Sequence, residues 1–291
     1  MTIGLWGAMI GSTLAWSGFD VIRKHLVMSM PIEVLAFWIS LAQLPGYLLW
    51  ALLEGNFRVE QEYWLPAFAS VVLNLAANFL FLISVQRGAL SVTVPVLSFT
   101  PVFAAILAGP LLGEHLVLSQ WWGVGIVTVS SLFLTASPSL VRTPLQLFTS
   151  FAGSPGVPQM LGVALLWAAS PIFDKLALRG AAVPIHGAVL ALTGAVGMGL
   201  LVLFKGQGAQ LKLNRPTSFW IAAGGLTNIA ALGLQLVSIT TMVVSVFEAF
   251  KRASGVLLAL ILGALFFHER ISRSRAFAAV FIASGVILVL K

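Results

Sequence analysis

The chain has 291 residues, of which 59% are hydrophobic and only 9% are charged. Soluble domains carry about 25% charged residues, so this chain has too little polar surface to face water, and its solvent must be lipid. The formal charge of +7 does not indicate a nucleic-acid surface, because the basic residues lie mostly at the ends of apolar runs, where they anchor and orient spanning helices. The absence of cysteine excludes a disulfide framework and a thiolate metal site.

Ten apolar segments follow one another along the chain, and each is close to the length of about 20 residues that a spanning helix needs. We therefore predict an all-α integral membrane protein with ten transmembrane helices. The predicted helices are Ile3–Leu26, Ile32–Leu53, Trp64–Val85, Ala89–Leu112, Gln120–Ala136, Gln159–Leu178, Ile185–Phe204, Ser218–Val237, Met242–Phe267 and Arg275–Leu290.

The sequence matches itself at an offset of about 154 residues, which places Asn74 on Asn228 and Asp20 on Asp174. Shared polar residues in one register indicate a duplicated unit. We predict a first repeat over residues 1–137, a linker rich in Pro, Ser and Gly over 138–158, and a second repeat over 159–291. Each repeat holds five helices, and an odd number requires the second repeat to enter from the opposite side, which gives two inverted five-helix repeats.

Lysine and arginine are more numerous in the loops after the odd-numbered segments than in the loops after the even-numbered ones. The positive-inside rule places the richer loops in the cytoplasm and both termini outside. We expect a multi-pass protein of a bacterial inner (cytoplasmic) membrane.

The fourth predicted helix carries a motif in which Pro95 and Pro101 are followed by Leu112-Gly113-Glu114. This motif resembles the fourth-helix signature of the drug/metabolite transporter superfamily, EamA type, and residues 255–270 resemble its second copy. The resemblance implies ten helices around a central cavity lined largely by helices 1, 3, 4, 6, 8 and 9. Relatives export amino acids or other metabolites, and some exchange nucleotide sugars or phosphorylated sugars.

The ninth predicted helix carries Glu248, Lys251 and Arg252 near its middle. A basic side chain at the centre of the bilayer costs about 2.5–3.5 kcal/mol on insertion scales. One reading is an anion clamp, in which Arg252 binds a carboxylate or phosphate bidentately and Lys251 adds a point charge. The alternative is local pairing, because both cations are within reach of Glu248 along one helix face. One carboxylate does not neutralise two cations.

The cation pair also resembles the pair on the ninth helix of the phosphate-translocating branch of the superfamily. That branch has a further lysine on the fourth helix, whereas residues 96–98 of this chain contain none. The difference favours a substrate with a single carboxylate over a phosphate ester.

Asn74 and Asn228 lie near the middle of the third and eighth predicted helices, with Asn78 and Gln235 extending the polar stripes. Amide groups donate and accept hydrogen bonds, so these four side chains are candidates to bind a polar solute. The alternative is hydrogen bonding between helices, which contributes about 0.6 kcal/mol on average.

Two aspartates related by the repeat, Asp20 and Asp174, lie near the ends of the first and sixth predicted helices. They are candidates for a gate or for a site of proton coupling, and the alternative is an interfacial ion pair with nearby Lys and Arg. Pro95 and Pro101 interrupt the hydrogen-bond ladder of the fourth helix and are candidates for bending during gating.

Trp16 and Trp167 lie within the first and sixth predicted helices, away from the ends where tryptophan anchors a helix at the interface. They are candidates to line the cavity and to stack on substrate. Ordinary helix packing is the alternative.

These observations predict a secondary transporter that moves a small polar organic metabolite by alternating access, with an amino acid or similar carboxylate-bearing solute as the exported substrate. The alternatives are an organic-anion or phosphate-ester exchanger and a lipid flippase. An enzyme is disfavoured, because no metalloprotease motif, paired acidic metal motif or Ser/His/Asp arrangement is present. We expect no cofactor and no metal. The expected partners are a small-molecule substrate, the bilayer, and a coupling proton or counter-substrate.

Overall fold

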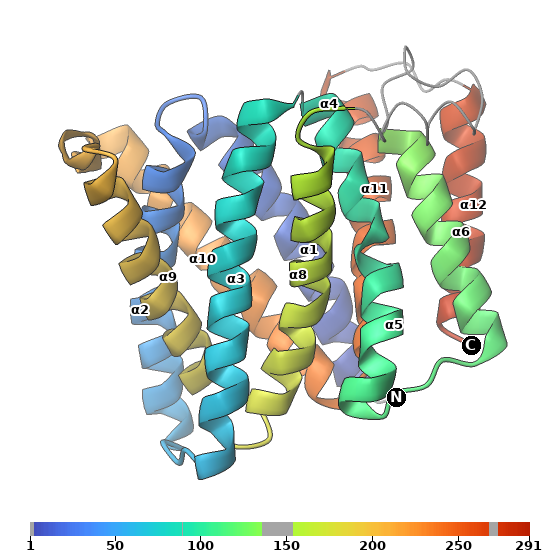
Figure 1. Ribbon diagram of the computed structural model, residues 1–291, viewed down its shortest axis with the longest axis horizontal. Coiled ribbons are helices and arrows are strands. Elements are labelled where there is room, and N and C mark those ends of the chain that lie inside the picture. The colour runs from blue at the N-terminus through green and yellow to red at the C-terminus, as the bar shows by residue number, and fades with distance from the viewer. Residues whose placement is uncertain (1–2, 89, 136–153, 268–272) are drawn as a thin grey trace. The chain divides into compact units, whose positions relative to one another are not determined.

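The computed structural model describes residues 3–88, 90–135, 154–267 and 273–291 (Figure 1). Within these ranges the chain is helical nearly throughout, and the predicted all-α fold is confirmed. Of the predicted linker 138–158, only the last five residues, 154–158, lie inside the described ranges. The α-helices are α1 (Ile3–Leu26), α2 (Ile32–Glu54), α3 (Trp64–Arg87), α4 (Leu90–Thr93), α5 (Thr100–Leu112), α6 (Leu118–Thr135), α8 (Val157–Ala177), α9 (Val183–Phe204), α10 (Arg215–Thr241), α11 (Val244–Phe267) and α12 (Arg273–Val289). Three 3₁₀ segments, η1 (Gln61–Tyr63), η2 (Val94–Phe99) and η3 (Gly208–Leu211), accompany them.

The fourth predicted helix is interrupted. It consists of α4, the 3₁₀ segment η2 and α5, with Pro95 in the first turn of η2 and Pro101 in the first turn of α5. Proline lacks an N–H and excludes the carbonyl of the preceding turn from the α ladder, so two prolines six positions apart favour the 3₁₀ geometry of residues 94–99. α5 then ends at Gly113, whose φ of 72° lies in the left-handed region that glycine adopts at little cost.

The helices pack into two compact units, and each unit takes helices from both halves of the sequence. The first unit comprises Met1–Leu75 and Phe173–Thr241, and the second comprises Ala76–Ile172 and Met242–Lys291. A repeat is a relation between sequences, whereas a packing unit is set by which helix faces complement each other.

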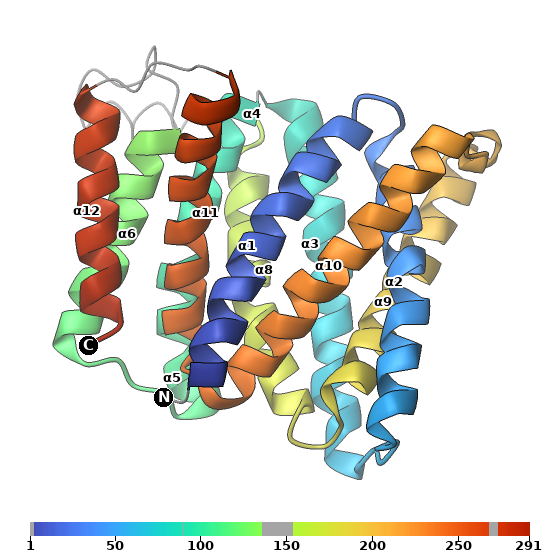
Figure 2. The ribbon, with the colours of Figure 1, turned by 180° about the vertical axis from the view of Figure 1, so that it is seen from behind.

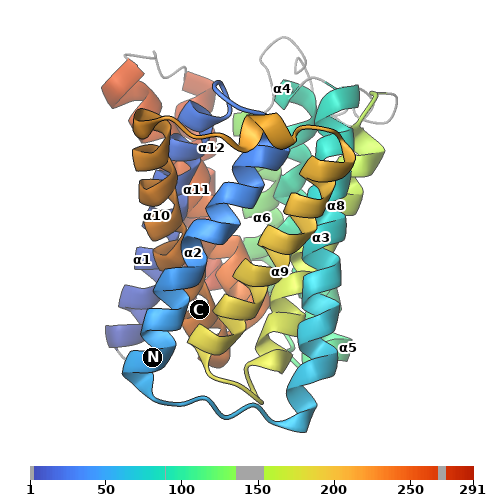
Figure 3. The same cartoon turned by 90° about the vertical axis from the view of Figure 1, so that its left-hand side faces the viewer.

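In the first unit α1 packs along α10, and α2 packs along α9 (Figures 2 and 3). The face of α9 toward α2 is built from small residues, and Gly187 lies so close to the Tyr47 ring that a Cβ there would approach a ring carbon to 2.3 Å. The other face of α9 carries an exposed apolar stripe at helical spacing, formed by Leu192, Val196, Leu200 and Leu203. Such a stripe is stable only where lipid replaces water.

In the second unit α6 and α12 lie side by side (Figures 1 and 2). Their closest approach is between glycines: a Cβ on Gly123 would lie 2.7 Å from the Gly285 carbonyl oxygen, and a Cβ on Gly285 would lie 3.1 Å from the Gly123 oxygen. Small residues let helix backbones approach where no hydrophobic effect drives association. α11 packs against α5, α6 and α12.

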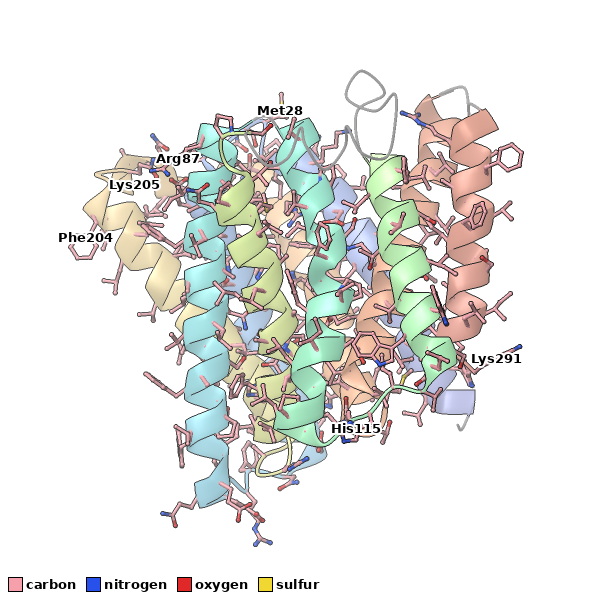
Figure 4. The ribbon with its side chains drawn as sticks, turned by 45° about the vertical axis from the view of Figure 1, so that its right-hand side comes forward. Met28, Arg87, His115, Phe204, Lys205 and Lys291 are labelled. Atoms are coloured by element: carbon pink, nitrogen blue, oxygen red, sulfur yellow. The ribbon has the colours of Figure 1, made fainter. Side chains whose placement is uncertain are left out.

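Six helices of the described part are long and apolar enough to cross a membrane, and two further apolar helices are shorter. Large apolar side chains are exposed along them, for example Leu65 and Phe68 on α3 and Phe204 at the end of α9. Figure 4 shows Phe204 and Lys205 at the end of α9 and His115 after α5. Basic side chains at helix ends and apolar side chains between them are the pattern of a multi-pass integral membrane protein.

Candidate functional site

The charged centre of α11 lies in the second unit. Lys251 Nζ donates a hydrogen bond to Glu248 Oε1 at 2.6 Å, and the Glu248 side chain is only 3% exposed. The Lys251 ammonium also lies 5.6 Å from the centroid of the Phe247 ring. The pairing that the sequence spacing allows is therefore formed, and it satisfies a carboxylate that would be costly to bury alone.

Arg252 reaches across to the broken helix. Its Nη2 donates to the Leu97 carbonyl oxygen at 2.7 Å, and that oxygen also accepts a hydrogen bond from the Thr100 hydroxyl. Leu97 belongs to η2, between the two prolines. The interruption of the helix thus presents a backbone carbonyl, which has no formal charge, to the guanidinium.

In the described part of the same unit, two of the buried hydroxyls without a hydrogen-bond partner lie close to the residues just described. They are Ser98 Oγ, one residue after the carbonyl that Arg252 contacts, and Ser245 Oγ, one turn before Glu248 on α11. Both serines are 1% exposed. An unsatisfied buried hydroxyl costs about 1–3 kcal/mol, so each is a candidate to bind a polar ligand. The sequence analysis did not select them, although the repeat offset places Ser98 on Arg252.

Glu114, the last residue of the Leu-Gly-Glu motif, has a structural contact. Its Oε2 accepts a hydrogen bond from the Val244 N–H at 2.8 Å, at the first residue of α11. The first N–H groups of a helix have no partner inside the helix, and a carboxylate there also interacts favourably with the helix dipole. Glu114 therefore fixes the start of the helix that carries Lys251 and Arg252.

Asp174, in the first unit, is the centre of a buried hydrogen-bond network. Its Oδ1 accepts a hydrogen bond from Ser70 Oγ and lies 3.0 Å from His186 Nε2. His186 Nδ1 lies in turn 3.2 Å from the Tyr63 hydroxyl. Asn74 Nδ2 donates to the Ser70 carbonyl oxygen at 3.1 Å and lies 3.3 Å from Ser70 Oγ. One chain of contacts thus connects Asn74 to Tyr63.

The sequence analysis expected nearby Lys and Arg beside Asp174, and the structure places Ser70 of α3 and His186 of α9 against it. The sequence analysis missed Ser70, Tyr63 and His186. The available signal was a histidine three residues into an apolar helix, which by itself does not reveal a partner. Asp20 behaves as the ion-pair alternative predicts: its Oδ1 lies 2.8 Å from Arg23 Nη2, and its side chain is 58% exposed.

The candidate residues on α1 and α10 also meet. Trp16 Nε1 donates to Gln235 Oε1 at 3.0 Å, which joins two of the predicted substrate-binding residues in the first unit. Asn228, on the same helix as Gln235, is buried with 7% exposure. Trp16 also packs edge-on against Phe19, with ring centroids 5.9 Å apart.

Trp167 and Asn78 belong to the second unit. Trp167 packs against Phe81 with ring centroids 5.7 Å apart, at the border of an apolar cluster that includes Ala77 and Met160. Asn78 is half-buried on α3. The contacts of Trp167 are those of helix packing. Among the described residues, no group of three or more His, Asp and Glu side chains is arranged to hold a metal ion.

Among the described residues, long helices with exposed apolar faces and basic side chains at their ends define a multi-pass integral membrane protein. The sequence profile of the EamA-like transporter family matches the chain twice, over residues 3–136 and 154–291. The chain belongs to this family, and it is therefore a membrane transporter of the drug/metabolite type.

The search of solved structures supports the fold. A structure titled "Crystal structure of protein" superposes with a TM-score of 0.79 over 98% of this chain and 97% of the other, at 13% sequence identity. This likeness concerns the fold alone. A search of the curated proteins finds no match.

Proposed function

We propose that the protein is a secondary transporter that exports a small polar metabolite with a carboxylate, most simply an amino acid, by alternating access. Membership of the EamA-like transporter family means that the protein transports a solute across a membrane. The charges on α11 support the further step to an anionic group on the substrate.

The observation that carries the proposal is the charge balance of α11. The helix holds two cations and one carboxylate, and the carboxylate is paired with Lys251 at 2.6 Å. A substrate carboxylate would bring the summed charge of the α11 side chains to zero.

Arg252 suits this role because its contact on Leu97 is with a neutral carbonyl oxygen. A carboxylate offers two oxygens in the geometry of the guanidinium fork, and charge-assisted hydrogen bonds of this kind are about twice as strong as neutral ones. We infer that an incoming carboxylate accepts hydrogen bonds from Arg252 in place of the Leu97 carbonyl oxygen. Ser98 and Ser245 would supply nearby hydroxyls. Release of the Leu97 carbonyl would then couple binding to the break between Pro95 and Pro101.

The remaining candidates receive roles in the same scheme. We propose them as substrate-contacting residues of their own units: Trp16, Asn74, Asn228 and Gln235 in the first unit, and Asn78 and Trp167 in the second. We place the protein in a bacterial inner membrane, with repeats over 1–137 and 159–291 joined by the linker 138–158.

The test is a thermal-unfolding screen of the purified protein against amino acids, organic acids, sugar phosphates, nucleotide sugars and phospholipids. A ligand that binds only the folded state at about 100 times its Kd stabilises it by about 2.7 kcal/mol. We expect an amino acid to raise the melting temperature of the wild type and to have no such effect on Arg252→Ala.

Arg23→Ala is the matched control, because it removes an arginine whose side chain is 46% exposed, in a surface ion pair. It should respond to the ligand as the wild type does. Stabilisation only by phosphorylated solutes would replace the amino acid with a phosphate ester, and stabilisation only by phospholipids would indicate a flippase. An Arg252→Ala protein stabilised as strongly as the wild type would exclude the clamp.

A further inference from the structure

The buried network around Asp174 contains two titratable groups that the substrate scheme above does not use. Asp174 and His186 are 2% and 0% exposed, respectively. The loops beside them are joined at the backbone: the Glu60 N–H donates to the Gly180 oxygen at 2.8 Å, and Val59 pairs with Ala181. Figure 3 shows the loop between α2 and α3 beside the loop between α8 and α9. The network is thus enclosed at one end of the first unit.

Each of the two groups lies at a helix end. Asp174 lies in the last turn of α8, and His186 lies in the first turn of α9. The negative end of the α8 dipole repels a carboxylate, and the positive end of the α9 dipole repels an imidazolium. A buried carboxylate next to a neutral imidazole leaves one negative charge in a medium of low dielectric constant. One additional proton on the pair removes that charge.

The hydrogen bonds accommodate the pair with and without this proton. Without this proton, Asp174 is a carboxylate, His186 Nε2–H donates a hydrogen bond to it, and Nδ1 accepts a hydrogen bond from the Tyr63 hydroxyl. With the extra proton on the carboxyl group, Asp174 donates to Nε2, and Nδ1–H donates to the Tyr63 oxygen. The proton belongs to the coupled pair rather than to either residue. The contact distances of 3.0 and 3.2 Å suit both arrangements.

Other polar and charged groups surround the pair on each neighbouring element. Tyr47 of α2 lies within electrostatic range of Asp174. Lys175 and Arg179 follow Asp174 along the chain, and the loop before Tyr63 carries Glu60, paired with Arg58 at 3.2 Å. Residues 58–62 line an open surface depression of about 630 Å³. The chain next to the network is therefore in contact with water, the source and destination of a proton.

The network also reaches a proposed substrate residue. Ser70 Oγ donates to Asp174 and lies within hydrogen-bond distance of the Asn74 amide. A solute that binds the Asn74 amide would change the hydrogen bonding of Ser70 and, through it, the hydrogen bond that Asp174 accepts.

We propose that Asp174 and His186 form the site at which this transporter binds and releases its coupling proton, with Ser70 as the positioning residue that connects the site to Asn74. The proton comes from water on one side of the membrane and returns to water on the other. The proposal rests on the transport function proposed above, so its test needs one measurement that requires no substrate.

That measurement is a pH titration of the ¹⁵N-histidine spectrum of the whole protein in micelles, with the His186 signals assigned by His186→Gln. We expect the imidazole nitrogens of His186 to titrate and Asp174→Asn to change their titration. Asp20→Asn is the control and should leave it unchanged. His186 nitrogens that do not titrate over the range in which the protein stays folded would overturn the proposal.

The transport measurement uses proteoliposomes and a mixture of radiolabelled proteinogenic amino acids. A pH gradient of about one unit supports a roughly tenfold accumulation ratio if one proton is exchanged for each substrate molecule. Asp174→Asn should lose this accumulation and retain exchange of labelled for unlabelled amino acid, as an uncoupled carrier does, and Asp20→Asn should accumulate substrate normally. Accumulation by Asp174→Asn equal to the wild type would overturn the proposal.

The two measurements separate the two proposals. A wild type that carries no amino acid at any pH contradicts the proposed substrate, and the histidine titration still decides on the proton site. If Asp174→Asn loses exchange as well as accumulation, the titration again decides, because it detects the proton without requiring transport.

Discussion

In the last third of α1, Asp20 is an exposed carboxylate paired with Arg23 of its own helix. At the end of α8, Asp174 occupies the same position in the second repeat and is enclosed by Ser70 and His186 from other helices. The difference lies in the neighbouring segments of each helix end. The Asp20 side chain stays exposed, whereas α3 and the first turn of α9 cover Asp174. Duplication copied the residue, and packing changed its environment.

The largest difference expected between the ends of α1 and α8 is the side of the membrane from which a reagent can reach them. The inverted topology predicts that the ends of α1 and α8 face opposite sides of the membrane. Within the first unit they lie at opposite ends, with Met28 at the top of Figure 4 and the loop after α8 at the bottom of Figure 1. The chain has no cysteine, so Met28→Cys and Arg179→Cys each give a unique label site.

An impermeant thiol reagent added to intact cells should label only one of these two variants, and the other should react only after the membrane is opened. Labelling of both variants in intact cells would contradict the inverted repeats.

Alanine substitution of the two aspartates should lower the stability of the protein by very different amounts. Asp174→Ala leaves His186 and Ser70 buried beside a cavity and should lower the free energy of unfolding by about 3 kcal/mol. Asp20→Ala removes one exposed ion pair and should change it by no more than about 0.5 kcal/mol. Denaturant titration of the purified proteins measures both values, and equal losses would show that the two sites do not differ in burial as described.

Ser70→Ala is the mildest change to the buried site. It removes one of the two hydrogen bonds to Asp174 Oδ1 and should cost about 1 kcal/mol of stability. If Ser70 only stabilises the fold, the pH profile of transport will match the wild type. If Ser70 positions the proton site, the profile will shift, and Ser70→Thr, which keeps the hydroxyl, will restore it.

The helices and the break in the fourth of them could be predicted from the sequence, because hydropathy, proline chemistry and spacing along one helix are local properties. The lengths of the apolar runs predict spanning helices, Pro95 and Pro101 predict the interruption of the fourth helix, and the spacing of Glu248 and Lys251 predicts their ion pair. Each of these conclusions needs only the residues within a few turns of one another.

The surroundings of Asp174 were decided by the tertiary structure alone. Ser70 lies 104 positions from Asp174 in the sequence. His186 is only 12 positions away, but it belongs to the next helix, beyond a turn. Which side chains meet there depends on how α3, α8 and α9 cross, and close approaches such as Gly187 against Tyr47 set those crossings. The sequence by itself determined that two aspartates are related by the repeat, and only packing determined which of them is buried beside a histidine.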